Sequence, residues 1–185
     1  MHPRRIMETD PQNNITLPET LGLIVLEECF HFPSCNLPLY IFENRYRQML
    51  DHALGTTRMF GVGTVVEGKL LPVTTAGLVS ASRKHDDGTS HVMLYGLKRV
   101  RITGWVQDEP FRIAKIQPLK TEIMEPPDVG FQMLKKQALE LLPAASEGCG
   151  ESMKKLRAAL EEMTNPERFC DILSFYFMND AGVQS

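Results

Sequence analysis

The sequence lacks a membrane-spanning run, an export signal and any paired cysteine motif. No stretch of its 185 residues approaches the roughly 20 apolar positions that cross a bilayer, and residues 1–16 contain no apolar signal-peptide core. Without export, its thiols are expected to stay reduced, and none forms a C-x-x-C pair. These thiols are Cys29, Cys35, Cys149 and Cys170. We therefore expect a cytoplasmic protein that makes no contact with membranes.

An excess of charge of one sign is also missing. The formal net charge is -3, with 43% hydrophobic and 23% charged residues, which is typical of a soluble globular chain. A chain of this length can bury a core without metal or disulfide support. The charge argues against a dedicated nucleic-acid-binding protein.

Motifs for nucleotide and nucleophile chemistry are absent or incomplete. No G-x-x-x-x-G-K-[ST] phosphate loop occurs, and Gly61-Val62-Gly63 leads into a strand rather than a helix. Ser152 and Lys155 form an S-x-x-K pair without the accompanying S-D-N or K-T-G, so we interpret them as a solvated helix face. We expect no enzymatic activity and no cofactor.

Two groups of residues contain the side chains that commonly bind metals. Cys29, His31 and Cys35 lie close together in one loop, but their spacing matches no common zinc pattern and no fourth ligand is evident. His85 and His91 flank a turn to which Asp86 adds a carboxylate. Loop packing and a solvated hairpin tip are the favoured interpretations, so we expect no metal site.

The middle of the chain predicts strands, because short apolar segments alternate with turn residues. Asp87-Gly88 predicts a type I′ hairpin turn, in which both central residues have positive φ. The expected strands are Leu21–Leu26, Phe60–Glu67, Thr74–Lys84, Ser90–Tyr95, Arg99–Gln107 and Phe111–Pro118. Tight connections between short strands indicate a mostly antiparallel sheet curled into a partial barrel.

Helices are predicted at two places, one between the first two of these strands and the other after the last. An extended segment from Leu37 to Phe42 leads into a helix that Gly55 ends, with apolar residues at Tyr46, Met49, Leu50, Ala53 and Leu54. Pro126 and Pro127 end the last strand, and Asp128 can cap the helices that follow. The expected stripes are Phe131, Leu134, Ala138 and Leu141; then Met153, Leu156, Leu160 and Met163; then Phe169, Ile172, Leu173, Tyr176 and Phe177, with Phe175 and Met178 beside them.

Three ordered motifs carry a family resemblance. The segment Leu37–Leu50, L-P-L-Y-I-F-E-N-R-Y-R-Q-M-L, resembles the L-P-L-H-I-F-E-P-R-Y-R-x-M-L signature of the N-terminal, substrate-binding domain of Lon proteases. Phe60-Gly61-Val62 and the G-x-x-R-x-R-I sequence at Gly96–Ile102 resemble two later elements of that domain. Tyr40 stands where the family often has His, and Asn44 replaces a Pro but is itself a good helix cap.

The resemblance implies an α+β fold with a β pseudo-barrel related to RNA-binding PUA domains, followed by a small helical bundle. We expect a flexible tail over residues 1–16, the pseudo-barrel over 17–124 and the helical portion over 125–185. The family usually continues into another helix. We therefore expect either that the sequence is trimmed before that helix, or that something outside this chain covers the apolar last helix.

The function that the resemblance implies is binding of unfolded polypeptide segments or of a partner protein, linked to ATP-dependent proteolysis. The sequence has neither the phosphate loop of Lon nor the surroundings of its catalytic Ser and Lys. Exposed apolar residues are the candidates for contact, and the last helix is also a candidate for self-association into a homo-oligomer. The candidate contact residues are Phe30, Phe32, Pro33, Tyr40, Phe175 and Met178.

Two further hypotheses concern the basic residues. Arg83, Lys84, Arg99 and Arg101 could form a strip that binds RNA, although Tyr95 and Trp105 lack the paired spacing of a stacking platform. Arg99 or Arg101 could instead pair with Glu43 and lock the helix to the sheet. Glu43→Ala would then cost roughly 2–4 kcal/mol.

Overall fold

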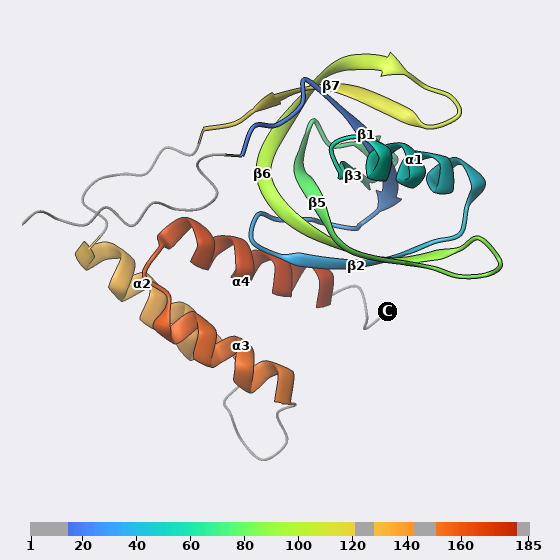
Figure 1. Cartoon of the computed structure of the whole chain (residues 1–185). Helices are drawn as coiled ribbons and strands as arrows, with labels where there is room; N and C mark the ends of the chain where they lie inside the picture. Colours follow the sequence, from blue (N-terminus) through green and yellow to red (C-terminus); the bar gives the residue numbers. More distant parts are fainter. Residues whose placement is uncertain (1–14, 121–127, 143–150, 181–185) are drawn as a thin grey trace, which may run out of the picture. The chain divides into compact units, whose positions relative to one another are not determined.

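The strands of the N-terminal part form one sheet that closes on itself (Figure 1). Its neighbours run β1-β7-β6-β5-β3, and β1 also pairs with β3 in parallel, which completes the ring. Among the described residues, every other strand pairing is antiparallel, so the α+β prediction with a mostly antiparallel sheet is confirmed. The strands are β1 (Thr20–Glu27), β2 (Asn36–Ile41), β3 (Met59–Val66), β4 (Lys69–Leu70), β5 (Val73–Lys84), β6 (Ser90–Gln107) and β7 (Arg112–Pro118).

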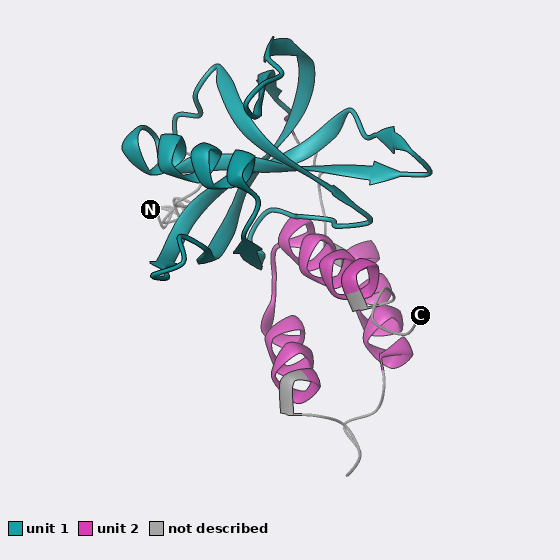
Figure 2. Cartoon of the chain, turned by 90° about the vertical axis from the view of Figure 1, so that its right-hand side faces the viewer, with its two compact units in different colours: residues 1–119 teal, residues 120–185 magenta. Residues whose placement is uncertain are grey.

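This computed structural model describes residues 15–120, 128–142 and 151–180. The chain divides into two compact units, one ending at Leu119 and the other beginning at Lys120 (Figure 2). Nearly all of the expected tail, the prolines before Asp128, Cys149 and the side chain of Ser152 lie outside the described residues.

The core of the first unit consists of apolar residues that face the inside of the ring. Leu23 and Val100 are fully buried, and Ala76, Ala114 and Leu21 complete the cluster with Ile116. Alternation along β6 places Arg99 and Arg101 on the side opposite Val100, as predicted.

The two strands expected over Ser90–Gln107 are one continuous strand, β6. Gly96, which lies between the two expected strands, keeps its strand pairing with Gly77. The register with β5 shifts by one residue next to this pair, and β2 supports the other side of β6 up to Tyr95. A β-bulge therefore absorbs the irregularity that the sequence suggested was a turn.

The turn between β5 and β6 is wider than the predicted type I′ turn. The amide of Gly88 donates to the carbonyl of His85 at 2.9 Å, and the amide of His85 donates to the carbonyl of Thr89 at 2.8 Å. Gly88 has a φ of 82°, whereas Asp87 is not among the described residues with positive φ. The connection is therefore a three-residue loop closed by a left-handed glycine.

Helix α1 (Asn44–Gly55) follows β2, and its predicted inner face is confirmed by the burial of Tyr46, Met49, Leu50 and Ala53. The predicted cap is wrong by one residue. Glu43 has extended backbone angles and its carbonyl accepts from the amides of Tyr46 and Arg47, so Asn44 is the first helical residue.

The second unit contains α2 (Asp128–Leu141), α3 (Glu151–Glu162) and α4 (Pro166–Asp180). Its core consists of Leu142, Leu160 and Phe169, with Phe131, Ala138, Leu139, Leu156, Met163, Ile172 and Leu173 packed around them. The stripes of α3 and of the first half of α4 are confirmed. The α2 stripe is partly wrong, because Leu134 and Leu141 are exposed while Lys135 and Leu142 are buried.

Lys135 occupies the core-facing position that Leu134 was expected to take. Its Nζ donates to the backbone carbonyls of Glu161 and Met163, both at 2.7 Å. The last carbonyls of a helix have no partner within the helix, and the negative end of the helix dipole favours a cation there. The buried lysine therefore ties α2 to the end of α3.

Candidate functional site

The signature segment joins the strands of the first unit to α1. The hydroxyl of Tyr46 donates to the carbonyl of Val25 at 3.1 Å and accepts from its amide at 3.2 Å. Arg47 donates from Nε to the carbonyl of Phe42 at 2.8 Å and from Nη1 to the carbonyl of Asp87 at 3.3 Å. Arg47 thus links the strand–helix junction to the β5–β6 turn.

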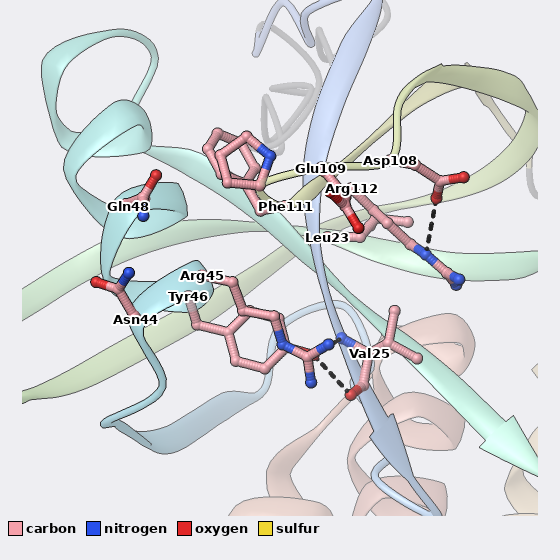
Figure 3. A pocket seen from close by; sticks show the side chains of 11 residues that line it. Leu23, Val25, Asn44, Arg45, Tyr46, Gln48, Asp108, Glu109, Phe111 and Arg112 are labelled. Atoms are coloured by element: carbon pink, nitrogen blue, oxygen red, sulfur yellow. Dashed lines mark hydrogen bonds and ion pairs between the residues drawn. The ribbon is translucent and has the colours of Figure 1, made fainter.

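A groove of about 670 Å³ lies between this helix, β1 and the β6–β7 turn (Figure 3). Its lining combines apolar and charged side chains from these three segments. The lining residues are Leu23, Val25, Asn44, Arg45, Tyr46, Gln48, Asp108, Glu109, Pro110, Phe111 and Arg112. None of these lining residues is a Ser, Cys or His.

Each arginine of the groove has its own carboxylate partner. Arg45 pairs with Glu43 at 2.8 Å, and Arg112 pairs with Asp108 at 3.2 Å. Arg112 also lies over the ring of Trp105, 5.4 Å from its centroid. These partners offset the positive charge, so the groove offers no strong excess of charge to an anionic ligand.

The Glu43–Arg45 pair replaces the predicted contact between Glu43 and Arg99 or Arg101. Ile41, two residues before Glu43, pairs with Ser90 at the beginning of β6. Arg99 lies nine residues farther along that strand, which corresponds to about 30 Å. The prediction was therefore wrong, because it ignored which end of β6 meets the helix.

Glu43→Ala is consequently expected to leave stability almost unchanged. The side chain of Arg45 is 57% exposed and that of Glu43 is 38% exposed, so solvent reaches the pair. Exposed ion pairs contribute about 0–1 kcal/mol. Urea unfolding of Glu43→Ala and wild type should give nearly coincident midpoints, and a loss of several kcal/mol would show that Glu43 has a further buried partner.

The basic residues considered for RNA binding do not form one strip. Arg83 pairs in register with His91, whereas Arg99 pairs with Thr75 much farther along β6. Lys84 contacts Asp51 at 3.6 Å, and the guanidinium of Arg99 lies 5.9 Å from the centroid of Phe32. The strip prediction is wrong, because the two pairs of residues lie at different ends of the β5–β6 ladder.

The loop between β1 and β2 is fastened to the sheet by hydrogen bonds. The hydroxyl of Thr64 donates to the carbonyl of Cys29 at 2.6 Å, and that of Thr75 donates to the carbonyl of His31 at 2.7 Å. Pro33 is buried, so its predicted role in an exposed contact surface is wrong. Phe30 and Phe32 are half-buried, and a binding role for them stays a prediction.

His31 is buried within this loop. Its Nε2 lies 3.2 Å from the carbonyl of Cys35, which requires Nε2 to carry the proton and donate. Burial lowers the pKa of His31 to about 4. Hydrogen bonds with the backbone of Cys35 and Leu94 raise this pKa, but burial has the larger effect. Burial also raises the pKa of the Cys29 thiol. Among the described residues no cluster of three or more His, Cys, Asp or Glu ligands occurs, so we interpret Cys29, His31 and Cys35 as packing residues.

Exposed apolar side chains gather on one face of the paired strands β2 and β6. Tyr40 is 50% exposed and Phe42 57%, and their rings stack with centroids 5.9 Å apart. Tyr40 pairs in register with His91, and the exposed Pro38 pairs with Met93, so all four share this face. We call this set, Pro38, Tyr40, Phe42, His91 and Met93, the Tyr40 surface.

Of the Tyr40 surface, only Tyr40 was a predicted contact residue. Phe42 and Met93 were missed, since every residue from Leu37 to Phe42 is apolar and alternation cannot say which side faces outward. The pairing with β6 decides it, because the alternate residues Leu37 and Ile41 are buried.

On α4, the predicted contact residues are at least partly accessible. Phe175 is half-buried and Met178 is exposed. Phe177, expected inside the apolar stripe, is also exposed, because the stripe turns away from the core near the end of the helix. Self-association through α4 stays a prediction. Among the described helices, none is long and apolar enough to cross a bilayer.

Comparison with solved structures shows the same fold in Lon N-terminal domains. The N-terminal domain of a Mycobacterium avium complex Lon protease superposes with a TM-score of 0.67 at 12% identity, covering 85% of this chain and 82% of that one. A Lon N-terminal domain protein from Xanthomonas campestris gives a TM-score of 0.54 at 20% identity, with 83% and 96% covered.

Sequence relatives point to the same family. The Lon proteases of Dictyoglomus thermophilum and Trichlorobacter lovleyi are 21% and 22% identical, over 86% and 88% of this chain. The chain spans only 21% of the length of either relative. The profile of the family described as ATP-dependent protease La (LON) substrate-binding domain matches residues 20–181. Since this match covers most of the sequence, the resemblance is confirmed, and the chain belongs to the LON substrate-binding domain family.

Proposed function

We propose that this domain binds extended, apolar polypeptide segments at the Tyr40 surface. The observation that carries the proposal is the exposure of stacked Tyr40 and Phe42 beside Met93 on one face of the sheet. Contiguous exposed apolar side chains commonly mark interaction sites. Tyrosine and other aromatic residues provide a large contact area with few rotatable bonds, which suits them to central positions in interfaces.

The position of β2 in the sheet supports an extended ligand. Within the described residues β2 pairs only with β6, which leaves its other edge without a neighbouring strand. An extended peptide can add to such an edge through main-chain hydrogen bonds while its side chains contact the adjacent face. Pro38 removes one donor from the edge and limits continuous pairing there.

The description of the family as a substrate-binding domain supports a polypeptide as the ligand. In this proposal the domain holds unfolded segments for an ATP-dependent protease. The matched relatives are full-length Lon proteases, of which this chain corresponds to about a fifth.

Replacing the two stacked rings should weaken binding of unfolded polypeptide. Loss of one interfacial aromatic side chain commonly costs about 1–2 kcal/mol, so the loss of two in Tyr40→Ser/Phe42→Ser should raise Kd roughly 30- to 800-fold. Fluorescence anisotropy with a labelled, permanently unfolded polypeptide measures the change, and thermal unfolding confirms that both proteins are folded.

Trp105→Ser is the matched control, because Trp105 is 43% exposed but lies outside the Tyr40 surface. It should leave Kd unchanged. Equal weakening by Trp105→Ser, or an unchanged Kd in the double variant, would contradict the proposed site.

A further inference from the structure

At the tip of the β5–β6 hairpin, two imidazole nitrogens face each other across the strands. Nε2 of His85 and Nδ1 of His91 are 2.6 Å apart, and the rings meet nearly edge to face at 84°. One nitrogen must donate a hydrogen and the other accept it. With both nitrogens deprotonated, their lone pairs would point toward a common position between the rings.

These nitrogens border a recess of about 340 Å³ lined by Tyr40, His85, Asp87, Thr89 and His91. Oδ1 of Asp87 accepts from the amide and the hydroxyl of Thr89, at 2.9 and 2.6 Å. The recess therefore contains a fixed carboxylate charge close to two imidazoles.

The surrounding charges are mixed. Asp86, in the turn, is exposed beside Asp87. Arg83 opposes His91 in the β5–β6 register and is an exposed positive charge, while Lys84 is directed to Asp51 at 3.6 Å. Arg47 also reaches the turn, where its Nη1 donates to the carbonyl of Asp87 at 3.3 Å. The two aspartates of the turn offset Arg83 and Arg47, so no net positive charge prevents a cation from entering.

We propose that this recess binds a divalent transition-metal ion of the Zn²⁺, Ni²⁺ and Cu²⁺ class through His85 Nε2 and His91 Nδ1. Imidazole is a preferred ligand of these ions, whereas Mg²⁺ and Ca²⁺ require oxygen ligands. Metal–nitrogen bonds of 2.0–2.1 Å in a tetrahedral arrangement place the two nitrogens about 3.3 Å apart. The rings must therefore separate by roughly 0.7 Å, which side chains at an exposed hairpin tip can do.

Water completes the coordination shell, because the described residues contain no cluster of three or more His, Cys, Asp or Glu ligands. The sequence favoured a solvated tip for these histidines. The antiparallel pairing of β5 and β6, and the three-residue turn between them, bring both nitrogens to one position.

Titration calorimetry of the full chain without an affinity tag tests the proposal with Ni²⁺ at pH 7.5. We expect one saturable site per chain, and His85→Gln and His91→Gln should each raise Kd at least tenfold. Affinity should rise from Mn²⁺ to Ni²⁺ and again to Cu²⁺.

His52→Gln is the matched control, since His52 is an exposed histidine on α1 that does not line the recess. The thiols are alkylated in every sample, because Cys170 is exposed and thiolates bind the same ions. Unchanged Ni²⁺ affinity in both His85→Gln and His91→Gln, or no saturable binding by wild type, would overturn the proposal.

Discussion

Gly96→Ala is expected to destabilise the first unit by about 3 kcal/mol, the upper end of the usual cost of overpacking. A Cβ at position 96 would lie 2.0 Å from the backbone oxygen of Phe32 and 3.1 Å from the Cα of Pro33. Both atoms belong to the main chain, so no side-chain rotation can relieve the contact. The close approach also allows two hydrogen bonds, from Ser34 N to Gly96 O and from Gly96 N to Cys35 O, each at 2.9 Å.

Urea unfolding monitored by tryptophan fluorescence measures the effect, because Trp105 is the only tryptophan of the chain and lies in the first unit. In a thermal scan the same loss corresponds to a decrease in Tm of roughly 6–12 °C. Gly104→Ala is the control on the same strand, where the nearest atom to an added Cβ is Lys115 Cδ at 4.0 Å. Coincident midpoints for Gly96→Ala and wild type would show that the loop can move aside without cost.

Stability of the first unit should also fall as the pH drops from about 6.5 toward 4, because His31 is buried in its neutral form. Its pKa is about 4 in the folded protein and about 6.5 in an unfolded chain. Above pH 6.5 both states are neutral, and His31 adds no pH dependence. Below pH 6.5 the unfolded chain binds the proton first, which favours unfolding by up to 1.36 kcal/mol per pH unit and about 3 kcal/mol in total.

The comparison is between wild type and His31→Gln across pH 7.5 to 5, where few carboxylates titrate. His31→Gln loses packing, so we expect it to be less stable than wild type at pH 7.5. Between pH 7.5 and 5, however, the free energy of unfolding should fall by about 2 kcal/mol less in His31→Gln than in wild type. Parallel slopes for His31→Gln and wild type would show that His31 is already accessible to protons in the folded state.

Elements with strong local periodicity could be predicted from the sequence. Helix α1 and strand β1 follow from the spacing of their apolar residues, and Gly55 ends the helix as expected. The family could be inferred as well, because its signature is a contiguous segment whose residues have local structural roles. Tyr46 and Arg47 of that segment hold the helix against the strands.

Features that depend on strand register could not be predicted. Three findings follow from which residues of β2, β5 and β6 lie opposite one another. They are the continuity of β6, the distance of Glu43 from Arg99, and the placement of the basic residues at different ends of the β5–β6 ladder. Lys135 was missed for a similar reason, since its partners are backbone carbonyls of another helix. A sequence pattern contains no information about such partners.

By itself, the sequence determined the family through its contiguous signature. It also determined the α+β class and the inner faces of α1, α3 and the first half of α4, because these depend on the local spacing of apolar side chains. Only the tertiary structure decided which apolar residues remain exposed. Tyr40 and Phe42 lie on the outer side of β2, Pro33 is buried by its contact with Gly96, and His85 meets His91 across a hairpin. The physical reason is that burial and the meeting of polar groups depend on the pairing of segments distant in the chain.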